Sequence, residues 1–256
     1  MPLLGSKGIV RFLARYSEGL RLVVDYGSKS GAVFEYACRN QPCGSGPFGR
    51  WVDKKFLRSR RWQGLRQRTE TTKAIVAEIV ARRRAAGRTT MILDLASGTA
   101  PYLRELAREY GGDDLIIAAH DRDPRQLVLG RKLVAVEKLQ NFTFAVGDAT
   151  DEASYLTRHD PDIILAVGVF QLLRDDEAVR TVMRLTFSYL SPGGCFVCTT
   201  LATPNARGVD SFGASPAIRS PETIATWLRD AGFTNIDQRF SQPQGFALIG
   251  WKPQES

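Results

Sequence analysis

The 256 residues, 43% hydrophobic and 24% charged, are enough for one large α/β domain with an extension, and this composition excludes collagen, coiled-coil and disordered classes. Four cysteines do not make a disulfide scaffold, and no run approaches the roughly 18 apolar residues that span a bilayer. The net charge of +8 is uneven, because residues 1–88 carry 19 Lys and Arg against 6 Asp and Glu, whereas the remainder carries 16 against 21.

This asymmetry predicts two parts: a basic, mainly helical N-terminal extension over residues 1–88 and a mildly acidic domain over residues 89–256. A basic segment indicates an anionic partner, such as nucleic acid, a membrane surface or an acidic substrate. Lys7, Arg11 and Arg15 interrupt the first apolar positions, unlike a signal peptide. We therefore expect a cytoplasmic protein, with peripheral contact at the inner membrane face as an alternative.

The extension has the pattern of helices separated by glycine-rich loops. Apolar residues at three- and four-residue spacing predict one amphipathic helix over residues 9–23, which the stretch 27–31 ends. A loop is expected over residues 40–49 and one long helix over residues 59–84. We expect the first helix to pack on the domain as a cap, with a position on an anionic membrane as the alternative.

Basic and aromatic side chains alternate around the start of the long helix. The set is Trp51, Lys54, Lys55, Arg58, Arg60, Arg61, Trp62, Arg66 and Arg68. Cations with aromatic rings suit a nucleic-acid backbone with stacked bases or an anionic lipid headgroup. A solvated helix face, with Trp62 and Leu65 packed inward, explains the same pattern.

From Thr90 onward, short apolar runs alternate with amphipathic segments, which predicts βαβ units in a doubly wound α/β fold with a mostly parallel sheet. The apolar runs are residues 91–96, 115–121, 142–148, 162–169 and 194–201. A helix over residues 221–231 is expected to lead to two further strands, 235–240 and 246–251, which form an antiparallel hairpin at the sheet edge.

The ends of the first two predicted strands carry acids. Asp94 ends the first strand, and the turn of small residues that continues to Ala100 would let a ligand approach the backbone closely, although a tight turn without a ligand has the same pattern. Asp121 ends the second strand, where a carboxylate can accept hydrogen bonds from a ribose diol. Asp123 before Pro124 is a helix N-cap.

Polar and small residues also follow the next two strands. Asp148 follows the third strand, where it could accept a hydrogen bond from an adenine amine, and Gly168 follows the fourth, where it would admit the edge of a ligand. Phe170 and Gln171 are expected to face the mouth of the pocket. Because parallel strands end at one edge of their sheet, the four ends together predict a cleft at the topological switch point.

These strand ends, with Leu190-Ser-Pro-Gly-Gly194 before a later strand, resemble the class I S-adenosylmethionine-dependent methyltransferases. The resemblance covers the chain from Thr90 onward and implies a Rossmann-like, seven-stranded, mostly parallel sheet with one antiparallel edge strand. It implies S-adenosylmethionine as the cofactor, with the turn 94–100 at the methionine moiety, Asp121 at the ribose, and Asp148 and Ala149 beside the adenine. The implied cofactor-binding residues are Asp94, Ala96, Ser97, Gly98, Tyr102, Asp121, Arg122, Asp148, Ala149 and Gly168.

Residues 30–68, followed by residues 94–102, are also similar to a bacterial methyltransferase family in which some members carry a preceding α/β-hydrolase domain. We expect the present sequence to hold the methyltransferase part alone. Ala96 is compatible with that family, whereas Ala100 departs from its usual glycine. The resemblance implies that Trp62, Arg66 and Arg68 lie near the pocket. Together with Phe170 and Gln171, they are the candidates for acceptor binding under an N-terminal lid.

The expected function is methyl transfer from S-adenosylmethionine to a small-molecule or lipid-like acceptor. The alternatives are an RNA or DNA methyltransferase that uses the basic segment as a clamp, and a non-catalytic binding module with the same fold. No catalytic residue is predicted, because displacement at a sulfonium requires mainly alignment of the reactants. Cys195 and Cys198 have zinc-like spacing, but they fall within one predicted strand and point to opposite faces, so no metal site is expected.

Overall fold

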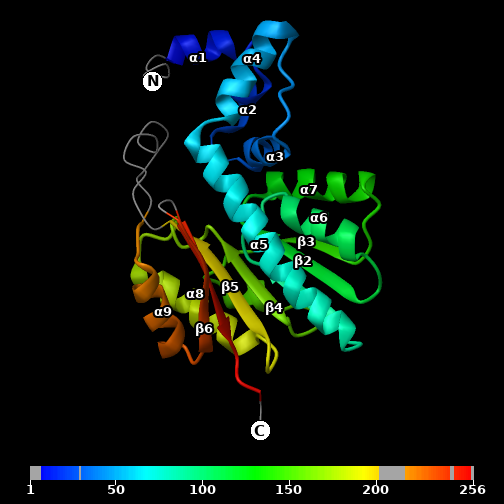
Figure 1. Cartoon of the computed structure of the whole chain (residues 1–256), viewed down its shortest axis with the longest axis vertical. Helices are drawn as coiled ribbons and strands as arrows, with labels where there is room; N and C mark the ends of the chain where they lie inside the picture. The colour runs from blue at the N-terminus through cyan, green and yellow to red at the C-terminus, as the bar shows by residue number, and fades with distance from the viewer. Residues whose placement is uncertain (1–6, 29, 202–216, 243–244, 255–256) are drawn as a thin grey trace. The chain divides into compact units, whose positions relative to one another are not determined.

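The computed structural model describes residues 7–28, 30–201, 217–242 and 245–254, and these form two compact units (Figure 1). In the described ranges, the first unit comprises the residues up to Thr69 and the second those from Glu70 onward. The long helix α5 (Arg60–Ala85) contributes its first residues to one unit and its remainder to the other. The predicted helix over residues 59–84 is therefore confirmed.

The first unit consists of helices. In addition to the start of α5 it contains α1 (Lys7–Leu13), α2 (Glu18–Tyr26), α3 (Gly31–Arg39) and α4 (Gly46–Leu57). The prediction of a single helix over residues 9–23 is wrong, because Ser17 has an extended backbone and its hydroxyl accepts the N–H of Leu20 as an N-cap. The loop after α3 is also shorter than predicted, since α4 already begins at Gly46.

A buried carboxylate joins the elements of the first unit. Asp53 on α4 has no exposed surface. One of its oxygens accepts the hydroxyl of Ser17 at 2.5 Å and the N–H of Gly19 at 3.2 Å. The other accepts the hydroxyl of Tyr36 at 2.5 Å and the N–H of Cys43 at 3.1 Å. A charge buried in this way is tolerated only because four donors replace its water, so Asp53 ties α4 to α2, to α3 and to the following loop.

Replacing this carboxylate should loosen the whole first unit. We expect Asp53→Ala to destabilise it by about 3 kcal/mol or more, because the hydroxyls of Ser17 and Tyr36 would remain buried without their acceptor. Hydrogen exchange of peptides that cover α2 to α4 measures the effect. Asp25→Ala removes an exposed acid of α2 and is the matched control. Unchanged protection in Asp53→Ala would contradict the role given to this side chain.

The second unit contains a seven-stranded sheet in the order β3-β2-β1-β4-β5-β7-β6. Its strands are β1 (Thr90–Asp94), β2 (Leu115–Asp121), β3 (Phe142–Val146), β4 (Ile163–Val167), β5 (Cys195–Thr200), β6 (Thr234–Gln242) and β7 (Gly245–Trp251). The first five are parallel, whereas β7 runs antiparallel to both β5 and β6. The predicted doubly wound, mostly parallel fold with a C-terminal hairpin is confirmed.

The position of the antiparallel strand differs from the expectation. We expected one antiparallel strand at the edge, but the edge strands are β3 and β6, and β7 lies one place inward. The reason is that the hairpin folds back so that β7 takes the open side of β5, from Cys195 opposite Trp251 to Thr200 opposite Phe246. The edge strand β6 therefore pairs with β7 alone and runs parallel to β5.

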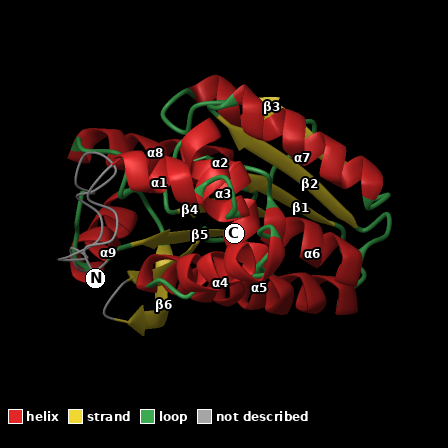
Figure 2. Cartoon of the chain, turned by 90° about the horizontal axis from the view of Figure 1, so that it is seen from above, coloured by secondary structure: helices red, strands yellow, loops and turns green. Residues whose placement is uncertain are grey.

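Helices cover both faces of this sheet (Figure 2). The later part of α5, with α6 (Pro101–Tyr110) and α7 (Pro124–Val136), packs on one face, and α8 (Asp176–Tyr189) and α9 (Pro221–Asp230) pack on the other. Along β5, Cys195 belongs to the first core and Cys198 to the second, which confirms that these thiols point to opposite faces. Nowhere in the described ranges do three potential metal ligands gather, and none of the helices there is both long and apolar enough to cross a bilayer.

Candidate functional site

The carboxyl ends of the parallel strands meet at one edge of the sheet. Asp94 at the end of β1 lies opposite Ala119 of β2 and Leu165 of β4, and Asp121 at the end of β2 lies opposite Val146 of β3. The chain adds β2 and β3 on one side of β1 and then returns to place β4 on the other side. Such a reversal is the topological switch point at which open α/β sheets bind their ligands.

The turn from β1 into α6 is tight and lined by backbone. Gly98 has a φ of 57°, and a Cβ added to it would meet no other atom within 4 Å, so this position faces open space. Ala100 has a φ of 52°, a left-handed conformation that costs an alanine roughly 1 kcal/mol. Its N–H donates to the carbonyl of Ser97 at 2.8 Å, which closes the turn. The sequence marked Ala100 as a departure from glycine, and the backbone conformation there is indeed one that favours glycine.

Asp121 joins this turn to its neighbour. One carboxylate oxygen accepts the N–H of Gly98 at 2.8 Å and the other accepts the N–H of Asp123 at 2.9 Å. Asp123 itself caps α7 through the N–H of Arg125 at 3.0 Å, as predicted. Ribose binding by Asp121 stays a prediction. Asp121 is only partly buried and remains accessible from the strand edge.

Asp148 lies just past β3 and is held on both sides. Thr150 donates to one oxygen through its N–H at 2.9 Å and its hydroxyl at 2.7 Å, and the exposed guanidinium of Arg122 lies 3.4 Å from the other oxygen. Burial alone would raise the pKa of Asp148, but these donors together lower it. The next residue, Ala149, is buried and accepts the hydroxyl of Tyr155 at 2.7 Å.

Asp94 and Tyr102 form a buried pair at the start of the site. The phenol of Tyr102 on α6 donates to one carboxylate oxygen of Asp94, and the N–H of Ala96 donates to the other at 3.2 Å. Burial raises the pKa of Asp94 to about 7, against the opposing effect of these two hydrogen bonds. Burial also raises the pKa of the Tyr102 phenol well above its ordinary value, so the phenol remains the proton donor.

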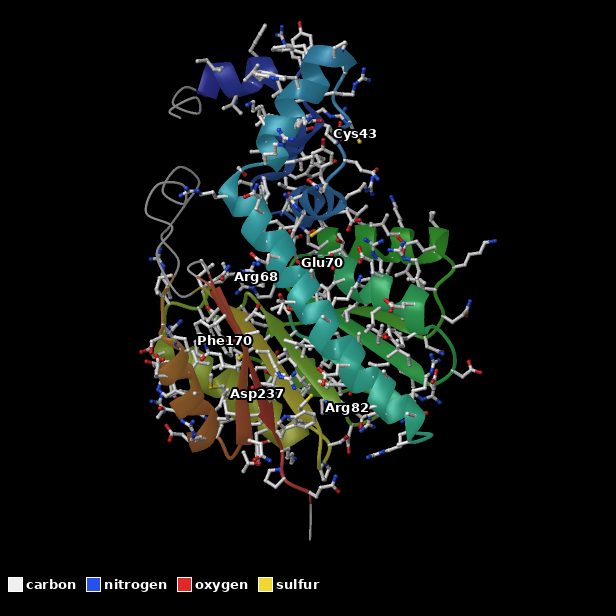
Figure 3. The ribbon with its side chains drawn as sticks, in the orientation of Figure 1. Cys43, Arg68, Glu70, Arg82, Phe170 and Asp237 are labelled. Carbon is white, nitrogen blue, oxygen red and sulfur yellow. The ribbon has the colours of Figure 1, made fainter. Side chains whose placement is uncertain are left out.

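The residues after β4 correct one expectation. Gly168 has a φ of 72° and donates its N–H to the carbonyl of Thr199 at 2.9 Å. Phe170, labelled in Figure 3, was expected at the mouth of a pocket, but it has no exposed surface and packs edge-on against Phe196. Gln171 is partly exposed, and its carbonyl accepts the N–H of Ala217 at 3.0 Å.

The other three predicted acceptor-binding residues belong to the first unit. Trp62 is buried there against Phe34 and Phe56, which agrees with the inward-packed interpretation. Arg66 donates to the carbonyl of Ala37 at 3.0 Å and to that of Leu57 at 2.9 Å, so it ties the C-terminal ends of α3 and α4 together. Arg68 follows on the same helix (Figure 3). Acceptor binding by these residues stays a prediction.

The sequence analysis did not identify two buried arginines, which hold the turn before α6 and the segment after β4 by hydrogen bonds. Arg104 of α6 donates through Nε to the carbonyl of Thr99 at 3.1 Å and pairs with Glu137 after α7. Arg219 donates to the carbonyl of Phe170 at 2.8 Å and to that of Leu173 at 3.0 Å. No sequence motif marks either residue, because Glu137 and the carbonyl groups that Arg219 binds are more than thirty positions away along the chain.

His120 next to Asp121 is buried, and its Nδ1 donates to the carbonyl of Ser154 at 2.8 Å. Burial lowers the pKa of His120, so the ring is neutral near pH 7. Its own carbonyl accepts the N–H of Ser97 at 2.9 Å, which links β2 to the turn after β1. His120 therefore packs at the end of β2 and supports the turn from β1 into α6.

The sheet order, the switch point and the acids at three strand ends define a class I methyltransferase fold. A sequence model of the family described as "Putative methyltransferase" matches residues 4–247, and the chain belongs to this family. The uncharacterized protein YnbC of Escherichia coli strain K12 is 28% identical over 246 residues, which are 91% of this chain and 42% of that protein. The chain thus spans about two fifths of the length of this curated relative.

Two solved structures share the fold. One, described as a "possible exported protein" from Bordetella parapertussis, is 19% identical, with a TM-score of 0.71 over 95% of this chain and 86% of that one. The other is phosphoethanolamine N-methyltransferase 2 of Haemonchus contortus in complex with S-adenosylmethionine. It is 17% identical, with a TM-score of 0.52 over 65% of this chain and 49% of that one.

The raised pKa of Asp94 predicts a pH dependence of stability. The ordinary pKa of an aspartate is 3.8, whereas that of Asp94 in the folded protein is about 7, so ionisation of Asp94 opposes folding. The resulting loss of stability is absent below pH 3.8, grows as the pH rises and is complete above about pH 7. Asp94→Asn carries no such penalty. The Tm of Asp94→Asn minus the Tm of the wild type should therefore increase by about 2 °C or more from about pH 5 to about pH 8, as measured by thermal unfolding.

Asp113→Asn, at an exposed acid between α6 and β2, gives the background change for this comparison. A constant Tm difference between Asp94→Asn and wild type across the same pH range would show that Asp94 is not held with a raised pKa.

Proposed function

We propose that the second unit binds S-adenosylmethionine at the carboxyl ends of β1, β2 and β3, and that the chain transfers its methyl group to a small-molecule or lipid-like acceptor. The observation that carries the proposal is the carboxylate of Asp121. It has about four lone-pair positions, of which the N–H groups of Gly98 and Asp123 take two. Two remain for neighbouring hydroxyl donors, as the ribose diol of the cofactor requires.

The neighbouring strand ends supply what the rest of the cofactor needs. The exposed guanidinium of Arg122 lies 3.4 Å from a carboxylate oxygen of Asp148, which makes a weak ion pair. An adenine amine can therefore replace Arg122 as a donor to Asp148 at little cost in free energy. Ala149 offers a small side chain beside it. At Gly98 the open space in place of a side chain suits the close approach of the methionine moiety to the turn.

The chemistry demands little else of the chain. When bound, S-adenosylmethionine supplies a methyl group on a sulfonium, and the transfer depends on in-line alignment rather than on a protein nucleophile. The residues of this chain would therefore bind and orient the reactants, and Arg219 would fix the backbone after β4.

The sequence after β4 disfavours one class of acceptor. Gly168-Val-Phe-Gln171 stands where methyltransferases of adenine or glutamine amino groups carry Asn/Asp-Pro-Pro-Tyr. This difference argues against transfer to such an amino group.

The proposal is tested by calorimetric titration with S-adenosylmethionine and S-adenosylhomocysteine. We expect micromolar binding by the wild type and a Kd raised about 10- to 100-fold in Asp121→Ala, since hydrogen bonds to a charged acceptor are lost. Asp123→Ala is the matched control, because it removes a neighbouring carboxylate of equal charge whose partners, the N–H and guanidinium of Arg125 and the amide of Gln126, all belong to α7. Its backbone N–H, which donates to Asp121, is retained.

Two outcomes would contradict the proposal. Equal losses in Asp121→Ala and Asp123→Ala would show that the effect is structural rather than a contact with the cofactor. Absence of binding by the folded wild type would favour the non-catalytic module. With binding established, transfer of a labelled methyl group to lipid extracts, small-molecule extracts and RNA compares the acceptor classes directly.

A further inference from the structure

The large apolar side chains exposed on the first unit include Ile9, Phe12, Tyr16, Phe48 and Trp51. Each is between 41% and 56% exposed. They come from α1, the turn that follows it, and the start of α4. We call this set the aromatic patch. None of these residues contributes to the candidate cofactor site.

The rings of the aromatic patch form a continuous chain. Phe12 contacts Tyr16 with ring centroids 5.8 Å apart, Tyr16 contacts Phe48 at 5.7 Å, and Phe48 stacks on Trp51 at 6.2 Å. Single exposed apolar residues are ordinary on protein surfaces, whereas a contiguous exposed group of large rings marks an interaction surface.

Close backbone packing builds the aromatic patch from distant parts of the chain. The N–H of Ser45 donates to the carbonyl of Tyr16 at 2.7 Å. A Cβ on Gly49 would lie 2.2 Å from the same carbonyl oxygen, so only glycine allows the start of α4 to approach so closely. The loop that carries Cys43 (Figure 3) leads into this contact, and the N–H of Cys43 is tied to Asp53. The surface is thus held in place by the core of the first unit.

The charges on the same elements all have one sign. The exposed charged side chains of residues 9–16 and 46–55 are Arg11, Arg15, Arg50, Lys54 and Lys55. The acid within these stretches, Asp53, is buried and hydrogen-bonded. The ammonium group of Lys55 lies 5.9 Å from the ring centre of Trp51, so positive charge borders the aromatic patch directly.

We propose that the aromatic patch and its five cations dock the first unit on an anionic lipid bilayer. Aromatic rings favour the interface between headgroups and acyl chains, and Lys and Arg are attracted by anionic headgroups. Single-stranded nucleic acid fits this surface less well, because the exposed Ile9 is aliphatic and offers no ring on which a base can stack, whereas an aliphatic side chain inserts readily among acyl chains. The inference is independent of cofactor binding, so either can fail alone.

The test is sedimentation of the chain of residues 1–256 with phospholipid vesicles, without cofactor. Vesicles of equal parts phosphatidylcholine and phosphatidylglycerol should bind the chain at low salt, and phosphatidylcholine alone should bind it much less. The double variant Phe48→Ser with Trp51→Ser should partition about tenfold less, because buried apolar area drives insertion. Tyr26→Ser is the matched control, since Tyr26 on α2 is 52% exposed but lies outside the aromatic patch.

Further variants change only exposed side chains and leave the fold intact. Lys54→Glu with Lys55→Glu should lower partitioning into the anionic vesicles about tenfold or more. Trp51→Phe should keep partitioning but remove most of the blue shift of tryptophan fluorescence on binding. Trp62 and Trp227 are already buried, and the half-buried Trp251 lies on β7 of the second unit.

Three results would overturn the proposal. The first is that the wild type binds neutral and anionic vesicles equally. The second is that both double variants still bind vesicles as the wild type does. The third is that the double variants lose binding to polyuridylic acid while they keep binding to vesicles. The last would assign the surface to nucleic acid instead.

Discussion

The carboxylate of Asp121 and its backbone hold the three turns on which the candidate site depends. Its side chain accepts one N–H from Gly98 in the turn after β1 and one from Asp123 in the turn after β2. Its carbonyl accepts the N–H of Gly147 after β3 at 3.1 Å. A parallel sheet leaves the backbone at its carboxyl edge without ladder partners, and one acid satisfies several of these groups at once. The same residue therefore holds the turns at this edge, and its remaining lone pairs are those that we propose for the cofactor.

The first unit uses the same physical solution for a different purpose. Asp53 also collects donors from several elements, but it is fully buried, and its four donors come from the chain itself. Asp121 is partly exposed and takes two. An enclosed, fully satisfied carboxylate can only stabilise a fold, whereas a partly exposed one can exchange water for ligand hydroxyls. This difference in exposure separates Asp53, which is enclosed, from Asp121, for which we propose a role in cofactor binding.

Much of the second unit was predictable because its signals are local. The strand over residues 115–121 and the helices on either side follow from hydrophobic periodicity and an N-cap before proline. Three features were not. Ser17 divides the first helix by a cap that the apolar spacing hides. The hairpin inserts β7 beside β5 because that strand had an open side. Phe170 turns into the core, where the Arg219 clamp holds its backbone and Phe196 packs on its ring.

The sequence by itself determined the alternation of strands and helices, the uneven charge, and the acids at the strand ends. These are properties of neighbouring residues, and parallel βαβ connections necessarily bring such ends to one edge. Only the tertiary structure decided which carboxylates are enclosed, which donors they collect, and that Tyr16 meets Phe48 on one surface. Several of these contacts join distant positions, such as Ser17 and Asp53 or Tyr16 and Phe48. They depend on how helices pack, which the periodicity of a single segment does not encode.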